Sequence, residues 1–155
     1  MLQRLRVGVS AFKKLRRTIM ADFGVLSAIR DLLKTEGDIV SEGVSNQIHI
    51  SYPSKTSIFP MIVLELEEVW TSLAMGKNSP KARIKLKAQT LSDKPSGKES
   101  ITIAEKVRNI IDGKTIRMEN GNLVTLRMEN CIVDIPTAIN KTRNVKQYFE
   151  AIVRG

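Results

Sequence analysis

The stretch from Phe59 to Gly113 decides the fold, because its patterns predict a strand, a loop, a strand and a helix in succession. It begins F-P-M-I-V-L-E-L-E-E-V-W (59–70), an apolar run with alternation inside it. It continues with K-A-R-I-K-L-K-A-Q (81–89), which alternates strictly, and ends with S-G-K-E-S-I-T-I-A-E-K-V-R-N-I-I-D-G (96–113). A period of two is typical of strands, and a period of 3.6 is typical of amphipathic helices. No catalytic signature lies in or around this unit.

The two strands of this unit are expected to differ in burial. Met61–Trp70 is apolar at every position from 61 to 64, and its odd positions then turn acidic at Glu65 and Glu67. This predicts burial on both faces first and on one face later. Thr71–Pro80 contains a cluster of turn residues and predicts a loop. Lys81–Gln89 places four small or aliphatic residues on one face and four cations on the other.

The helix of this unit has signals at both ends. Ser96 followed by Glu99 fits a capping box, and Gly113 is expected to end the helix. Its predicted buried face consists of Ile103, Ala104, Val107, Ile110 and Ile111.

A second helix is predicted upstream, over Ala21–Glu36. Asp22 is expected to cap its start, and Gly37 its end with a left-handed residue. A short strand is predicted around Ile48–Ile50. The apolar face of the helix, spaced at a period of 3.6, consists of Val25, Leu26, Ile29, Leu32 and Leu33.

The C-terminal third predicts further strands. Asn120-Gly121 predicts a tight hairpin turn, and Asn130–Asp134 extends its second strand. Pro136–Thr142 predicts a loop and Asn144–Val153 a final strand. The whole order predicts an α+β fold with a largely antiparallel sheet covered by two helices.

The net charge is concentrated at the N-terminus. The chain has 155 residues and a net charge of +9, of which Met1–Met20 contributes six basic residues and no acidic one. The sequence therefore divides into a basic arm (1–20) and one α+β domain (21–155). Several interpretations of the arm stay open. It is a disordered or loosely attached segment, a basic amphipathic helix that contacts a membrane surface, nucleic acid or a partner, a transit peptide, or an upstream extension of the reading frame.

The strongest electrostatic feature of the domain is a row of four cations on one strand face. A cationic stripe can follow a phosphate backbone, so these are the candidate lumen- or DNA-facing residues. The alternative is a solvated face whose charges are partly paired across the strands. A hairpin centred on Met75 places Glu67 opposite Arg83 and Glu65 opposite Lys85, and leaves the other two cations unpaired. The row consists of Lys81, Arg83, Lys85 and Lys87.

The remaining candidates for chemistry are better explained structurally. His49 is the only histidine and has no second metal ligand near it, so a structural or surface role is expected. Cys131 lies in an apolar strand, which favours a buried thiol over a nucleophile. Glu65 and Glu67 share a face with cations opposite them, which disfavours a metal site. No phosphate-binding glycine loop or catalytic triad is present, and we expect neither an enzyme nor a cofactor.

The order of elements, with P-M-I-V-L-E (60–65), the alternating strand and I-A-E-K-V-R-N-I-I-D-G (103–113), resembles the tail-terminator, or tail-completion, family of long-tailed bacteriophages and gene transfer agents. The likeness covers about residues 21–154 and leaves out the basic arm.

This resemblance implies a structural assembly protein, located in the tail of a virion or phage-like particle and assembled in the host cytoplasm. It implies a ring-forming subunit, typically in a hexamer, that caps the tail tube, stops its polymerisation and joins it to the head-side connector. The implied partners are further copies of the chain, the tube protein and the connector, with DNA passing through the lumen without sequence-specific binding. The alternatives are a basic α+β nucleic-acid-binding domain and a neck adaptor of the same particle.

Overall fold

The computed structural model describes residues 24–53, 58–71, 82–119, 121–134 and 142–155. Within them a six-stranded sheet has the order β1-β2-β3-β6-β5-β4. All neighbouring strands are antiparallel except β1 and β2, which are parallel. The strands are β1 (Ile48–Ile50), β2 (Met61–Thr71), β3 (Ala82–Ser92), β4 (Thr115–Arg117), β5 (Leu123–Asp134) and β6 (Arg143–Arg154).

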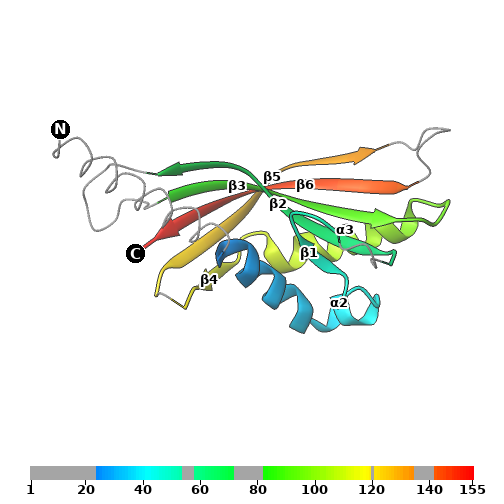
Figure 1. The fold of residues 1–155 in the computed structure, drawn as a ribbon, viewed down its shortest axis with the longest axis horizontal. Helices are drawn as coiled ribbons and strands as arrows, with labels where there is room; N and C mark the ends of the chain where they lie inside the picture. Colours follow the sequence, from blue (N-terminus) through cyan, green and yellow to red (C-terminus); the bar gives the residue numbers. More distant parts are fainter. Residues whose placement is uncertain (1–23, 54–57, 72–81, 120, 135–141) are drawn as a thin grey trace, which may run out of the picture.

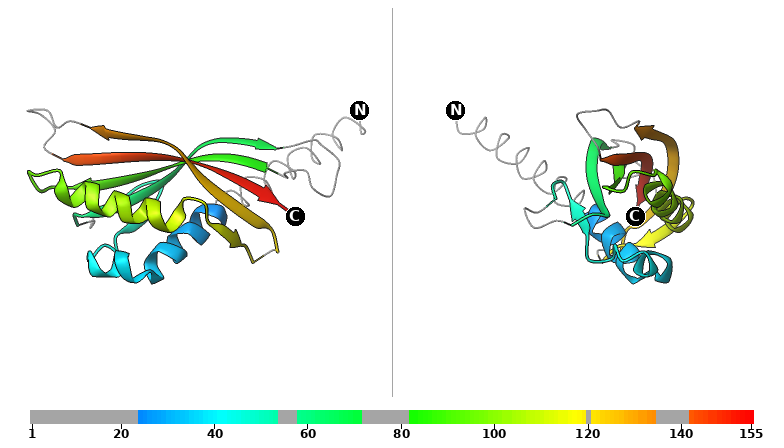
Figure 2. Two further views of the ribbon diagram at one scale, coloured as in Figure 1. Left: turned by 180° about the vertical axis from the view of Figure 1, so that it is seen from behind. Right: turned by 90° about the vertical axis from the view of Figure 1, so that its right-hand side faces the viewer.

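Helices cover one face of this sheet. A helix over residues 24–35 is followed by the short α2 (Gly37–Ser41), and α3 (Lys98–Ile111) joins β3 to β4. Figures 1 and 2 show that the sheet twists strongly and curls around these helices. The α+β class and the largely antiparallel sheet are confirmed, and the short α2 adds a third helix to the two that were expected.

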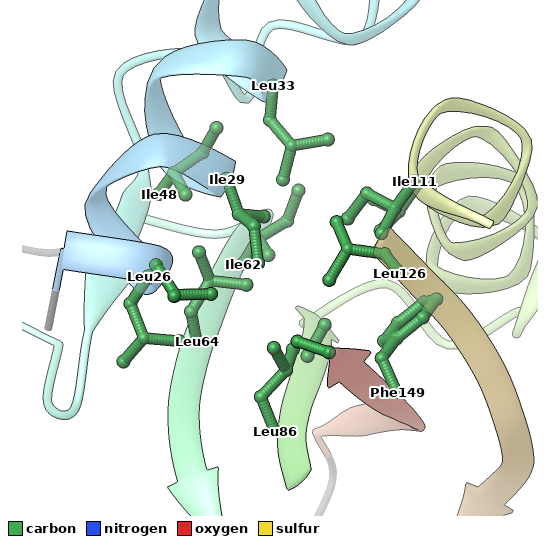
Figure 3. Packing of buried hydrophobic residues seen from close by; sticks show 14 of the residues in the cluster. Leu26, Ile29, Leu33, Ile48, Ile62, Leu64, Leu86, Ile111, Leu126 and Phe149 are labelled. Atoms are coloured by element: carbon green, nitrogen blue, oxygen red, sulfur yellow. The ribbon is translucent and has the colours of Figure 1, made fainter. Parts of the chain in front are cut away.

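The core lies between the helices and the inner face of the sheet. Figure 3 shows Leu26, Ile29 and Leu33 of the first helix pointing toward β2 and α3. Side chains from both halves of the chain therefore close a single core. Its largest fully buried members also include Ile62, Leu64, Leu86, Ile111, Leu126 and Phe149.

The predicted burial of β2 is confirmed. Met61 to Leu64 are all buried, whereas Glu67 and Glu68 in the second half are exposed. In β3 the even positions from Ile84 to Ser92 are buried, as strict alternation predicts. Ile110 differs from its prediction, because it is only partly buried at the margin of the core.

Two predicted helix ends are wrong. Gly37 begins α2 instead of ending the first helix, and the left-handed glycine comes later, at Gly43 (φ 72°). The N-cap of α3 is Gly97 and makes no side-chain cap hydrogen bond, so Ser96 and Glu99 form no capping box. The predicted stop at Gly113 is confirmed, since its φ is 75° and its N–H donates to the Leu126 carbonyl at 2.8 Å.

Glu99 instead ties the start of α3 to the end of β3. Its carboxylate accepts a hydrogen bond from Ser92 Oγ at 2.7 Å and pairs with Lys94 at 2.6 Å. The Lys94 contact lowers the pKa of Glu99, which burial would raise, and the Ser92 hydroxyl lowers it further. Glu99 therefore makes a tertiary contact between β3 and α3, and not the local cap hydrogen bond that the sequence pattern predicted.

Two β-bulges lie near the same level of the sheet, in β2 and β5, with β3 and β6 between them. In β2 the register shifts between Leu66 and Glu68, so Glu67 is the extra residue. In β5 it shifts between Met128 and Asn130, so Glu129 is the extra residue. Bulges increase local twist and bend the strand. Both flank one continuous inner row, Leu66–Leu86–Phe149–Met128.

The remaining sequence predictions have mixed outcomes. The hairpin between β4 and β5 is confirmed, with Gly121 at φ 86°. Asn130–Asp134 does continue β5. The expected cap at Asp22, most of the loops Thr71–Pro80 and Pro136–Thr142, and the basic arm Met1–Met20 lie outside the described residues.

Candidate functional site

The structure places three of the four candidate cations on the outer face of β3, which none of the described helices covers. These cations are Arg83, Lys85 and Lys87. Along the strand they alternate with Ile84 and Leu86, which are buried on the inner face. Lys81 lies outside the described residues. Because β3 is flanked by β2 and β6, the row runs through the middle of the sheet.

Lys87 is the most enclosed of these cations. Its Nζ lies 3.0 Å from Glu65 Oε2 and 3.3 Å from Glu67 Oε1. Burial lowers the pKa of Lys87, but the hydrogen bonds and charges of the two glutamates outweigh it and leave the pKa raised. The expectation that Lys87 is unpaired is therefore wrong.

The predicted β2·β3 register is also wrong, by two residues at Glu65 and by three residues at Arg83. Glu65 is opposite Lys87, Glu68 is opposite Lys85, and Trp70 is opposite Arg83. The bulge at Glu67 explains part of the difference, since it changes the register partway along the strand. The doublet Glu67-Glu68, which interrupts the alternation of β2, is the sequence signal for it.

The other two cations have acidic partners from strands far away in sequence. Arg83 Nε lies 3.2 Å from Glu150 Oε1 of β6, and Lys85 Nζ lies 3.8 Å from Glu129 Oε2 of β5. Lys85 also lies over the Trp70 ring, 5.3 Å from its centre. Sequence reasoning missed Glu129 and Glu150, because the insertion of β6 between β3 and β5 brings them to this face.

Glu129 and Glu150 form a close pair of carboxyl groups. A hydrogen bond with Glu129 raises the pKa of Glu150, burial raises it further, and Arg83 opposes the change. Across four strands the register gives Glu68, Lys85, Glu150 and Arg127, so acid and base alternate in one outer row.

The outer face is therefore a mosaic of paired charges. Each of the three described cations on β3 has at least one carboxylate within 4 Å. A phosphate backbone approaching this row would meet the carboxylates of three neighbouring strands as well as the cations. Such a surface attracts DNA much less than an isolated basic stripe does.

His49 and Cys131 lie at opposite edges of the sheet. His49 Nε2 is 3.3 Å from Gln47 Oε1, which fits the structural role expected for it. Cys131 is exposed, so the prediction of a buried thiol is wrong. It points to the inner face, but that end of β5 extends away from the helices (Figure 1). No group of metal-ligating side chains is found among the described residues.

Both edges of the sheet also expose apolar side chains. At the end of β5, Ile132 and Val133 are 42% and 54% exposed. Close to β1, Tyr52 is 84% and Ile58 is 67% exposed. Exposed apolar residues beside unpaired strand edges are a feature of surfaces that bind other protein chains. Within the described part of the chain, no helix combines the length and apolarity needed to cross a bilayer.

Comparison with solved structures finds the same fold in chains of low sequence identity. The structure matches a chain in the virion of a native gene transfer agent particle with a TM-score of 0.68. The two are 15% identical, and the match covers 84% of this chain and 94% of that one. A second solved structure matches with a TM-score of 0.56 at 13% identity, over 90% of this chain and 96% of the other. No known protein family and no curated protein matches the sequence.

At such identities the likeness establishes a shared fold. The chain thus has the fold of a component of a gene transfer agent virion, an α+β sheet curled around its helices.

Proposed function

We propose that this chain is a structural assembly protein that caps the tail tube of a phage-like particle. It stops tube polymerisation and joins the tube to the head-side connector, as one subunit of a hexameric ring. The observation that carries the proposal is the fold shared with a gene transfer agent virion chain, matched over 94% of that chain. Such a protein acts through its interfaces with other chains. The exposed apolar residues Ile132, Val133 and Tyr52 at the edges of the sheet provide surfaces for these interfaces.

The outer face of β3 fits a surface past which DNA moves without being held. In the proposed ring Arg83, Lys85 and Lys87 face the lumen, together with Lys81. Their pairing with Glu65, Glu67, Glu129 and Glu150 leaves little net charge to hold a phosphate backbone. DNA then passes without sequence-specific binding.

Electron microscopy of the purified chain tests the proposal. We expect rings with six-fold symmetry, at high concentration or on the ends of tubes made from the tube protein of the same particle. Added to growing tubes, the chain should stop their elongation. A chain that stays monomeric under all these conditions and leaves tube growth unchanged contradicts the proposal.

Salt-dependent DNA binding separates this role from that of a nucleic-acid-binding domain. A domain that contacts several phosphates loses affinity roughly tenfold or more between about 50 and about 200 mM salt. We expect little duplex binding by residues 21–155 at about 150 mM salt, and no further loss in an Arg83→Glu/Lys85→Glu/Lys87→Glu variant. The matched control, Lys34→Glu/Lys98→Glu/Lys114→Glu, reverses three exposed lysines elsewhere. Tight, salt-sensitive binding abolished only by the first set would favour the DNA-binding alternative.

A further inference from the structure

Each edge of the sheet ends in a strand segment without a neighbour among the described residues. On one side this segment is β1 (Ile48–Ile50), the first strand in the sheet order. On the other side β4 pairs with β5 only as far as Thr125, so the end of β5 around Cys131–Val133 has no partner strand beyond β6. Unpaired edges are ready to pair with another chain unless something blocks them.

The two free segments lie at the same level of the sheet. One inner row starts at Ile48 and ends at Val133, passing through Ile62, Thr90 and Val145. The next inner row starts at Ile50 and ends at Cys131, passing through Leu64, Ala88 and Gln147. A second copy placed beside the first without any shift along the strands would therefore continue both rows.

The strand directions also fit. β2, β3, β6 and β5 alternate in direction, and β1 is parallel to β2, so β1 is antiparallel to β5. A head-to-tail copy in the same orientation thus presents its β1 antiparallel to the free end of β5. This is the arrangement that already joins most strands of the sheet.

Alternate backbone N–H and C=O groups of both free segments also point away from the sheet, toward a second copy. Gln47 and Ser51 hydrogen-bond to β2, which turns the alternate residues Ile48 and Ile50 outward. On β5 the Cys131 N–H donates to Asn130 Oδ1 at 2.8 Å instead of to β6, so Cys131 and Val133 face outward. Residues that face each other in this way form the hydrogen-bonded pairs of an antiparallel ladder.

The charges of the two edges do not oppose contact. β1 contains no carboxylate, and His49 is its only titratable residue. At the end of β5 the carboxylate of Asp134 lies 3.1 Å from Lys146 Nζ, which neutralises it. The Ile50 carbonyl accepts from Tyr52 N–H, and the Cys131 N–H donates to Asn130 Oδ1, so the full ladder requires both local bonds to open or to be shared.

We propose that the free end of β5 pairs with β1 of a second copy of this chain, with Val133 opposite Ile48 and Cys131 opposite Ile50. This inference rests on the proposed ring and names the strands that join its subunits. The interface is heterologous, since different edges meet, and it has no shift along the strands. Such contacts close into rings when the rotation between copies allows it.

Cross-linking through the single cysteine tests the pairing directly. In a hydrogen-bonded antiparallel pair the Cα atoms are about 5.5 Å apart, within the range of about 4.4–6.8 Å that disulfides span. We expect an Ile50→Cys variant to form, on oxidation, a ladder of covalent multimers through Cys131 of the neighbouring copy. Lys34→Cys, on an exposed face of the first helix, should give no such ladder. The Ile50→Cys/Cys131→Ser variant should lose it.

A second pair of variants tests the same edge without cross-linking. Val133→Asp and Val40→Asp replace valines of similar exposure, 54% and 51%, on β5 and on α2. Both should melt as cooperatively as the wild type, because neither side chain lies in the core. Only Val133→Asp should lose ring formation, since it places an unpaired carboxylate in the joined sheet.

The outcomes separate this inference from the proposed function. If Val133→Asp forms rings normally, and Ile50→Cys forms rings without covalent multimers, the proposed strand pairing is wrong. The proposed ring is then still supported. Wild-type dimers linked through two Cys131 residues also overturn it, because they join like edges. A wild-type chain that assembles under no condition overturns both.

Discussion

Lys87 Nζ lies 3.0 Å from Glu65 Oε2, and the two residues are direct partners across β2 and β3. The ammonium group also reaches Glu67, the residue that the bulge adds to β2. Lys87 thus forms ion pairs with two residues of β2, the regularly paired Glu65 and the bulged Glu67. We infer that this contact stabilises the bulge and the twist that follows from it.

We expect Lys87→Glu to destabilise the fold clearly more than Lys87→Met does. Loss of an ion pair at the protein surface costs about 0.2–1 kcal/mol, whereas reversal also brings three carboxylates together. Glu65→Lys combined with Lys87→Glu should recover part of the loss. Urea denaturation of the four proteins measures these differences. Midpoints for Lys87→Met and Lys87→Glu that both equal the wild-type midpoint would show that the contact contributes nothing.

The Lys87 contribution should depend on pH in a defined direction. Its pKa in the folded protein is above the ordinary value of 10.5. The stabilisation is then fully present below pH 10.5 and is lost as the pH rises through the folded pKa. The difference in free energy of unfolding between wild type and Lys87→Met should be constant from neutral pH up to that point. A difference that changes between pH 6 and pH 8 would contradict this assignment.

Glu129→Gln should lower the pKa of Glu150. The hydrogen bond with Glu129 is the main cause of the raised pKa, and Arg83, which remains, acts in the opposite direction. Because its folded pKa is above 4.5, Glu150 binds a proton more tightly in the folded protein than in the unfolded chain, so its contribution to stability falls as the pH rises from 4.5 through the folded pKa. Carboxyl-detected NMR titration measures the shift. An unchanged Glu150 pKa in the variant would show that burial is the cause.

Leu64→Asp and Ile111→Asp should prevent folding, because both side chains are completely buried. An unpaired carboxylate in the core costs several kcal/mol, comparable with the roughly 5–15 kcal/mol that stabilises a domain. Ile101→Asp, on the exposed side of α3, is the matched control and should stay folded. Circular dichroism and thermal melting distinguish these results. A cooperative melt of Leu64→Asp would contradict the inward facing of β2.

Removal of Met1–Met20 should leave the fold intact. The core cluster of the described residues is closed by side chains from Val25 onward, and the first helix supplies its own apolar face. Residues 21–155 should melt in one cooperative transition near that of the full chain. Aggregation of the shortened chain, or loss of the transition, would show that the arm takes part in folding.

The helices and strands, and most of their buried faces, could be predicted from the sequence. Strict alternation decided which side of β3 is buried, and the 3.6 period of Ile103, Val107 and Ile111 decided the buried face of α3. Both periods follow from the geometry of a single element, so neighbouring residues are enough to reveal them. The resemblance to particle proteins rested on this order of elements, and the structural match supports it at the level of fold.

Which charges meet and which apolar residues stay exposed depends on tertiary packing. Glu150 reaches Arg83 because β6 lies between β3 and β5, and that strand order depends on packing summed over the whole core. Cys131 has the pattern of a buried residue, yet it is exposed because its strand runs past the helices. The spacing of apolar residues along an element predicts which face a side chain is on. Burial also requires that another element cover that face.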